Sequence, residues 1–311
     1  MFFWQGLLVF AVAAYSTFYL TRRFIGRFHA GGHVVKDMYK QGKPDVPTMG
    51  GVALIGGIMM SLIAAQLLFP EGQVENLLVF YFVVFIFGVF GLLDDLIRIK
   101  SRFKRVYIPF FLALPIGLLN IDTNISLFFT EVEIGWLAPY LFAPLYVMVV
   151  SNMINMHAGF NGLSGGLATI LVFFTGLAAY LRYGFQDALY ALPILGALLA
   201  FMWFNRYPSR IFLGNSGTML LGAGVGGLIV LYNLEIFGVI ILLPHIINFL
   251  LWIYWLANMH IHPHVKFARV REDGTIEPPN KLTMKYLVTS LFRVGELKAT
   301  LILYGITTVF C

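Results

Sequence analysis

Two adjacent carboxylates, Asp94 and Asp95, stand at the end of an apolar run, and five basic residues follow them before Val106. Adjacent acids repel each other unless a cation or a shared proton lies between them. Mg²⁺ prefers oxygen ligands and is commonly held by one or two carboxylates together with substrate phosphates. The pair therefore predicts either magnesium-dependent phosphate chemistry or a solvated helix end that its own basic residues neutralise.

The uncharged segment 151–166, SNMINMHAGFNGLSGG, is a second candidate for chemistry. Asparagine side chains offer neutral oxygen ligands and amide donors, and glycine lets the backbone come close to a ligand. A connector between two apolar runs needs only about five residues, so we expect a long polar loop that binds a ligand. The alternative is a loose, turn-rich loop without a ligand.

A third candidate, the segment 208–224, places a Gly-Asn-Ser-Gly turn at the start of an apolar helix. Backbone N–H groups at a helix N-terminus bind anions, so Asn215 is a candidate ligand for a phosphate or a metal ion. A simple N-cap is the alternative for Asn215. The glycines from Gly222 onward indicate close packing of helices.

Basic residues and histidines gather in the longest hydrophilic stretch, residues 258–285. Alternating histidines can bind zinc, but neither a cysteine nor a second ligand set accompanies them. A basic cradle for a phosphate substrate fits the charges better, and an ordinary cytoplasmic loop is the alternative. By itself, the basic segment 36–51 indicates no more than such a loop. The side chains concerned in 258–285 are His260, His262, His264, Lys266, Arg269 and Arg271.

The composition indicates that membrane helices position these residues. Of the 311 residues, 59% are hydrophobic and 12% are charged, whereas soluble domains average about 45–50% apolar and about 25% charged residues. This excludes soluble globular, disordered, collagen-like and disulfide-stapled proteins, and the single cysteine, Cys311, excludes a cysteine metal site within one chain. The net charge of +6 indicates loops that face anionic lipids or substrates, and no nucleic-acid partner is expected.

Ten apolar runs approach the length of about 20 residues that a bilayer span requires. They cover residues 2–20, 50–69, 77–93, 106–121, 136–151, 166–182, 188–204, 211–232, 236–257 and 297–310. Pro109 and Pro115 predict a break or kink in the run 106–121, and the charges around residues 281–296 predict an amphipathic or partly buried helix there. We therefore predict an all-α polytopic membrane protein with about ten transmembrane helices and a single domain, residues 1–311.

The distribution of charge predicts the orientation of these spans. If the first span starts outside, the loops on the opposite side hold 18 of the 21 Lys and Arg residues, which is a positive-inside pattern. These loops are 21–49, 94–105, 152–165, 205–210 and 258–285. Both termini then lie outside, and the polar candidates all lie on the cytoplasmic face. A transporter would instead place charges or inverted repeats within its spans, so this pattern favours an enzyme at the membrane interface.

Taken in order, these segments carry a set of motifs. P-T-M-G-G stands at 47–51, D-D at 94–95, N-x-x-N-x-x-x-G-F-N-G-L at 152–163 and P-S-R-I-F-L-G-N-S-G-T at 208–218, before the basic late loop. From about residue 36 to 285, the chain resembles the polyprenyl-phosphate N-acetylhexosamine-1-phosphate transferase superfamily, of the glycosyltransferase family 4 type. H-A-G-F-N-G-L is most similar to the archaeal and eukaryotic UDP-GlcNAc:dolichyl-phosphate GlcNAc-1-phosphate transferases, whereas bacterial relatives typically carry D-G-x-D-G there.

The resemblance implies a reaction and its partners. A sugar-1-phosphate, GlcNAc-1-phosphate by preference, passes from a UDP-sugar to a polyprenyl or dolichyl phosphate lipid, and UMP is released. This would be the first membrane step of N-glycan or cell-surface glycan assembly, at the cell membrane with the active-site loops cytoplasmic. The implied cofactor is Mg²⁺, for which Mn²⁺ is a substitute. Dimerisation fits the family, although no residue pattern in the chain indicates a homodimer.

The resemblance also implies roles for individual residues. Asp94 and Asp95 match the catalytic acid pair, which handles the metal or positions and deprotonates the lipid phosphate; Asp94, Asn155 and Asn215 match positions at the metal. The matched substrate-binding positions are Lys104 at a phosphate, Asn161 and Phe212 near the uracil, and His264, Lys266 and Arg269 around the pyrophosphate.

One departure from the family concerns the metal. The family usually has Gly-Asp in its third motif, and this chain has Gly214 and Asn215. An amide keeps the oxygen but loses the negative charge, so we expect weaker binding of Mg²⁺ without substrate. The same change would also fit an inactive or repurposed relative, which is one alternative function; a lipid or solute transporter is the other.

Overall fold

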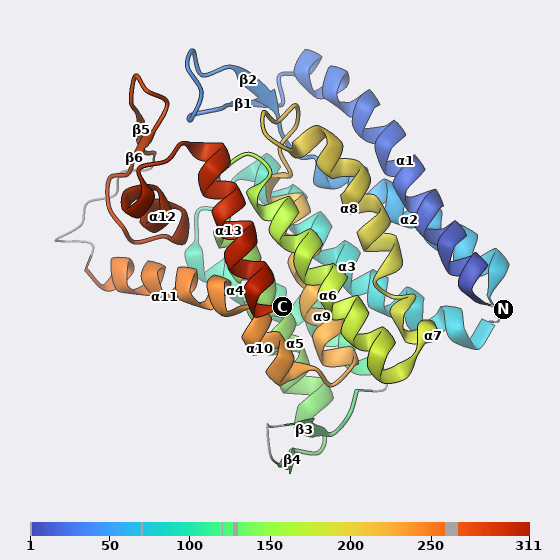
Figure 1. The fold of residues 1–311 in the computed structure, drawn as a ribbon. Helices are drawn as coiled ribbons and strands as arrows, with labels where there is room; N and C mark the ends of the chain where they lie inside the picture. Colours follow the sequence, from blue (N-terminus) through green and yellow to red (C-terminus); the bar gives the residue numbers. More distant parts are fainter. Residues whose placement is uncertain (1, 70, 120, 127–129, 259–266) are drawn as a thin grey trace.

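A computed structural model describes residues 2–69, 71–119, 121–126, 130–258 and 267–311, and most of them lie in helices (Figure 1). The α-helices are α1 (Phe2–Ala30), α2 (Gly51–Leu68), α3 (Glu71–Ile97), α4 (Arg102–Ala113), α5 (Ala143–Met156), α6 (Leu163–Tyr183), α7 (Phe185–Ala188), α8 (Leu192–Asn205), α9 (Gly214–Leu231), α10 (Glu235–Ile241), α11 (Leu243–Ala257), α12 (Met284–Phe292) and α13 (Glu296–Phe310). A 3₁₀-helix, Leu114–Leu118, follows α4, and a π-helix, Ala138–Phe142, precedes α5.

Three short antiparallel hairpins join some of these helices. Strand β1 (Val34–Lys36) pairs with β2 (Asp45–Pro47), with Val35 opposite Val46. Strand β3 (Asn124–Ser126) pairs with β4 (Glu131–Glu133), and β5 (Arg269–Val270) pairs with β6 (Ile276–Glu277). In Figure 1 the β1–β2 and β3–β4 hairpins lie at opposite ends of the helical bundle.

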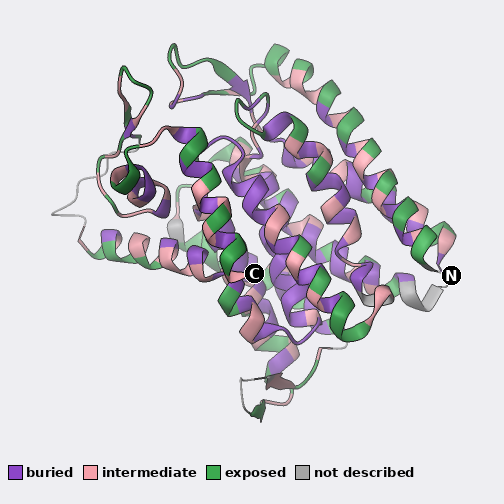
Figure 2. Ribbon diagram, viewed as in Figure 1, coloured by how far each residue is buried: buried purple, intermediate pink, exposed green. Residues whose placement is uncertain are grey.

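Helix α9 forms the centre of the fold and is buried along almost its whole length (Figure 2). Helices α2, α3, α5 and α6 all pack against it. The approach is close because glycine stands at the contacts: a Cβ atom at Gly91 of α3 would clash with the backbone oxygen of Asn215, and one at Gly222 would clash with the backbone of Ser151 on α5. The close packing predicted for the glycines from Gly222 onward is therefore confirmed.

Each predicted apolar run lies on one helix or on two consecutive helices, which confirms the predominantly helical fold. Among the described residues, five helices are long and apolar enough to cross a membrane, namely α1, α2, α3, α6 and α9. Helices α10 and α11 make a sixth span if this pair, bent by 68°, is counted as one. The number of ten spans stays a prediction.

The segment 151–166 is not the long polar loop that we expected. Helix α5 continues through Met156 and α6 begins at Leu163, so only residues 157–162 connect them. The polar side chains are compatible with a buried helix because they find hydrogen-bond partners: the Ser151 hydroxyl, for example, donates to the Met219 carbonyl on α9 at 2.9 Å. Residues 157–162 are called the connecting turn below.

Two other boundaries differ from the sequence pattern. Helix α1 extends to Ala30, so the basic residues at 22, 23 and 27 are exposed on a helix and do not belong to a loop. The run 106–121 is broken as expected, because α4 ends at Ala113 and a 3₁₀-helix with Pro115 in its first turn follows. Pro109, in contrast, is accommodated inside α4.

The C-terminal helices build a second, smaller hydrophobic cluster beside the main core. Helix α12 lies within the predicted amphipathic segment 281–296 and buries Met284, Tyr286 and Val288. These side chains pack with α13 and with Phe160 of the connecting turn. The C-terminal helices are thus joined to the segment that carries the G-F-N-G motif.

Candidate active site

The last turn of α3 meets the first turn of α9, and this contact places the acid pair. Asp95 accepts the backbone N–H of Asn215 at its Oδ1 (2.9 Å) and the backbone N–H of Ser216 at its Oδ2 (3.0 Å). Both N–H groups belong to the first turn of α9, where the helix dipole favours a negative charge. Asp95 therefore caps a neighbouring helix while its carboxylate stays beside Asn215.

Asp94 is buried and has partners on three sides. Its Oδ2 accepts the Asn215 side-chain amide (2.9 Å), and its Oδ1 accepts the backbone N–H of Ile99 (2.9 Å). The Arg105 guanidinium forms an ion pair with Oδ1 at 3.1 Å. The repulsion expected between adjacent acids is thus offset by an arginine and by amide donors of the chain itself.

Asn155 completes a row of side chains from three helices. Its amide donates to Asn215 Oδ1 (3.0 Å) and to the Thr218 hydroxyl (2.7 Å). The structure therefore brings together Asp94, Asp95, Asn155 and Asn215, which the sequence places on three separate motifs.

A cavity of about 230 Å³ opens beside this row. Asp95, Asn155 and Asn215 contribute polar groups to its lining, and Phe160 and Phe212 contribute aromatic rings. A second cavity, of about 580 Å³, is lined by Arg98 and by both acids. Asp95 thus borders two cavities.

The oxygen donors at this site suit a hard divalent cation. Asp94 and Asp95 supply carboxylates, and Asn155 and Asn215 supply amide oxygens, which are ligands that Mg²⁺ accepts. No group of three or more His, Cys, Asp or Glu side chains that could hold a metal occurs in the described part of the chain. The residues therefore fit Mg²⁺ that takes its remaining ligands from phosphate and water, and the zinc alternative falls on histidines at 260–264, outside the described residues.

The P-T-M-G-G motif has a clear local role. The backbone N–H of Phe212 donates to the Pro47 carbonyl and that of Gly50 donates to the Phe212 carbonyl, both at 2.8 Å. Gly51 N–H donates to the Leu213 carbonyl at 2.9 Å. This segment, which looked like an ordinary loop, holds the chain that leads from Phe212 into the first turn of α9.

The predicted substrate-binding residues are distributed unevenly. Phe212 is half-buried and lines the smaller cavity. Lys104 lies exposed in the first turn of α4, and Arg269 lies exposed on β5. His264 and Lys266 lie outside the described residues.

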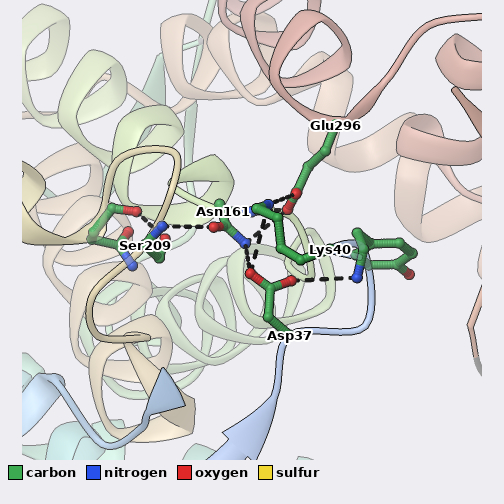
Figure 3. Close-up of polar contacts among 7 residues, drawn as sticks. Asp37, Lys40, Asn161, Ser209 and Glu296 are labelled. Atoms are coloured by element: carbon green, nitrogen blue, oxygen red, sulfur yellow. Dashed lines mark hydrogen bonds and ion pairs between the residues drawn. The ribbon is translucent and has the colours of Figure 1, made fainter. Parts of the chain in front are cut away.

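Asn161, predicted near the uracil, is buried in a polar network (Figure 3). Its side-chain amide donates to Glu296 Oε1 (2.8 Å) and Asp37 Oδ2 (3.1 Å), and its Oδ1 accepts the backbone N–H of Ser209 (2.7 Å). Its own backbone N–H donates to Glu296 Oε1 at 2.6 Å. The neighbouring Phe160 lines the cavity.

Sequence reasoning missed Asp37, Lys40 and Glu296 as parts of this network. Lys40 forms ion pairs with Glu296 and with Asp37, the latter at 3.6 Å. Burial raises the pKa of the Glu296 carboxyl, and the hydrogen bond from Lys40 opposes this shift. In the sequence, Glu296 is a charged residue at the start of an apolar run, and this position alone does not indicate which residues it bonds.

Comparisons with known proteins agree with these motifs. A sequence model described as glycosyl transferase family 4 matches residues 77–233. Two archaeal relatives carry the provisional name UDP-N-acetylglucosamine–dolichyl-phosphate N-acetylglucosaminephosphotransferase. The protein of Saccharolobus solfataricus is 26% identical over 98% of this chain and 92% of its own length, and that of Sulfolobus acidocaldarius is 28% identical over 98% and 94%. A phospho-N-acetylmuramoyl-pentapeptide-transferase of Oceanobacillus iheyensis is 29% identical over 76% of this chain and 78% of its own length.

Proposed function

The chain belongs to glycosyl transferase family 4, and from this premise we propose that it transfers a sugar-1-phosphate from a UDP-sugar to a polyprenyl phosphate. The names of its archaeal relatives point to UDP-GlcNAc as the donor and dolichyl phosphate as the acceptor. The product would be a lipid-linked sugar pyrophosphate, as in the first membrane step of N-glycan or cell-surface glycan assembly.

The observation that carries this proposal is the convergence of Asp94, Asp95, Asn155 and Asn215 beside a cavity with aromatic rings in its lining. Phosphoryl transfer depends mainly on positioning and on electrostatic stabilisation. The aromatic rings suit a base, and the polar row suits a pyrophosphate. Because Asp95 borders both cavities, it could face the donor and the acceptor at once.

In the proposed reaction, an oxygen of the lipid phosphate attacks the β-phosphorus of the donor. The bond from this phosphorus to the bridging oxygen breaks, and the electron pair leaves with UMP. Asp94 or Asp95 accepts a proton from the lipid phosphate or helps to hold the metal. Asn155 and Asn215 orient the pyrophosphate of the donor. When bound, Mg²⁺ would offset the charge of the pyrophosphate.

The proposal includes the membrane topology of ten spans, with both termini outside and the site cytoplasmic. The β1–β2 hairpin, at the end of α1 that carries three arginines, lies at one end of the bundle, and the acidic strand β4 lies at the other (Figure 1). Such a separation of charge supports the positive-inside orientation. A homodimer stays a prediction from the family resemblance.

Release of UMP by the purified protein in detergent tests the proposed function. With UDP-GlcNAc, dolichyl phosphate and Mg²⁺, we expect release that requires the lipid and is lost on chelation of the metal. Exchange of the UDP-sugar would then define the donor. A folded sample that releases no UMP from any UDP-sugar would overturn the proposal.

Substitution of Phe212 tests the use of the smaller cavity for the nucleotide. An aromatic side chain stacked on a base contributes about 1–3 kcal/mol, so Phe212→Leu should raise KM for the UDP-sugar by roughly ten-fold with a smaller change in kcat. Phe173→Leu on α6, where the ring is exposed, is the matched control. An unchanged KM in Phe212→Leu would place the base elsewhere.

A further inference from the structure

Three side chains of the C-terminal helices bond three different backbone groups of the connecting turn. The Lys285 ammonium on α12 donates to the Ala158 carbonyl at 2.8 Å. On α13, Glu296 Oε1 accepts the backbone N–H of Asn161 and the Tyr304 hydroxyl donates to the Gly162 carbonyl, both at 2.6 Å. We call these three side chains the clamp.

The connecting turn contains two glycines with left-handed backbone conformations. Gly159 and Gly162 adopt φ angles of +115° and +73°, which favour glycine. Glycine also leaves the backbone more conformational freedom to lose on ordering than other residues do. The bonds from the clamp therefore help to offset the entropy that the turn loses when it is ordered.

The clamped turn forms part of the wall of the candidate donor cavity. Ala158, Gly159 and Phe160 all line that cavity together with Asp95 and Asn215. The bonds from the clamp reach Ala158 and the two residues that follow Phe160, so they bracket the aromatic ring. The Lys285 ammonium also lies 5.5 Å from the centre of the Phe160 ring.

The charge of Glu296 is matched by a neighbouring lysine, so this carboxylate can persist in a buried place. Glu296 is 4% exposed and forms an ion pair with Lys40, whose ammonium also lies 3.9 Å from the centre of the Tyr207 ring. The Asn161 side chain joins Glu296 to Asp37 (Figure 3). A buried carboxylate is tolerated when it is paired and hydrogen-bonded, so this network fixes Glu296 against the turn.

We propose that Lys285, Glu296 and Tyr304 are positioning residues for the sugar-nucleotide donor, because they hold the connecting turn as one wall of its cavity. The proposal rests on the proposed function of that cavity. All three residues lie beyond residues 77–233, the part of the chain that the family model matches. They act through the turn and need not touch the substrate.

The variant Tyr304→Phe tests this proposal with the smallest change, because it removes only the hydroxyl that bonds Gly162. We expect KM for UDP-GlcNAc to rise about ten-fold, the effect of losing one hydrogen bond, while kcat changes less than two-fold. Amide hydrogen exchange in a peptide covering 157–162 should become faster, and the melting temperature in detergent should fall by only a few degrees. Tyr15→Phe, on an exposed ring of α1, is the matched control.

A second pair of variants separates positioning from general folding. Glu296→Gln keeps an oxygen that can accept the Asn161 N–H, whereas Glu296→Leu does not. We therefore expect KM and exchange of the turn to be closer to the wild type in Glu296→Gln than in Glu296→Leu. Equal KM in the two variants, or a fall in kcat and melting temperature without a change in KM, would overturn the proposal.

Failure of the clamp and failure of the proposed function give different results. If the wild type releases UMP and Tyr304→Phe leaves both KM and exchange of the turn unchanged, the clamp is wrong and the function stands. If the wild type releases no UMP from any UDP-sugar, the proposed function is wrong, and the donor role of the clamp is overturned with it.

Discussion

The double variant Asp94→Asn, Asp95→Asn is expected to release UMP at least about 10³-fold more slowly than the wild type, because removal of one oriented group at a charged transition state already lowers rates by about 10²–10³-fold. The two side chains are the carboxylates of the polar row described above. Without them, neither a proton acceptor nor an anionic metal ligand is left at Asn155 and Asn215. The rate of UMP release at saturating donor, acceptor and Mg²⁺ measures the effect.

The stability of this double variant needs its own control. Asp95 accepts two backbone N–H groups at the start of α9, and a neutral residue there loses the favourable interaction of charge with the helix dipole, which is worth about 0.3–2 kcal/mol. The melting temperature should therefore fall only slightly, whereas the activity should fall by orders of magnitude. The matched control is Glu131→Gln, Glu133→Gln, which neutralises two exposed acids on β4. Activity near the wild-type rate in a folded Asp94→Asn, Asp95→Asn sample would contradict the assigned roles.

Asn215→Asp is expected to raise the affinity for Mg²⁺ by about ten-fold or more, since the charge of the ligands sets cation affinity. In the wild type, the Asn215 amide donates to Asp94 Oδ2 at 2.9 Å. An aspartate would face Asp94 with an oxygen instead, and two carboxylates at that separation need a cation or a proton between them. The variant should thus melt at a lower temperature than the wild type without Mg²⁺ and gain more stability when Mg²⁺ is added.

Melting temperature and UMP release, each followed across a titration with Mg²⁺, measure this shift. Asn124→Asp on β3, at the other end of the bundle, controls for the added charge. If the Mg²⁺ requirement of Asn215→Asp equals that of the wild type, the expectation that the neutral side chain weakens Mg²⁺ binding is wrong. If the wild type is inactive and Asn215→Asp is active, the chain is a degenerate relative whose metal site is incomplete.

Local patterns were sufficient to predict much of the helical fold. The apolar runs gave every long helix, and the acid pair was correctly expected at a helix end because Asp94 and Asp95 follow a continuous apolar stretch. The break near Pro115 followed from the chemistry of proline. These features depend on neighbours within a few residues, which a sequence displays directly.

Contacts between distant segments account for what the sequence did not predict. Ser151 is accommodated inside a buried helix because its hydroxyl bonds the carbonyl of Met219 on α9. This partner is 68 residues away in the sequence, so the local pattern does not reveal it. Asn161 stays a predicted substrate-binding residue, but its bonds to Asp37 and Glu296, which are 124 and 135 residues away, were not predicted. A polar residue in a motif looks the same in the sequence whether or not it bonds a buried carboxylate, and only the fold shows that bond.

The glycine contacts around α9 have a consequence for motion. A Cβ atom at Gly51 would clash with the backbone of Gly217, as one would at Gly91 and at Gly222 with their own neighbours. At these three contacts, helices α2, α3 and α5 meet the backbone of α9 directly, so no side chain there can change rotamer to let α9 slide. A displacement of α9, which carries Asn215, would therefore require α2, α3 and α5 to move with it. Movements of loops, which take nanoseconds to microseconds, are therefore expected to contribute more to the opening of the site than a displacement of α9.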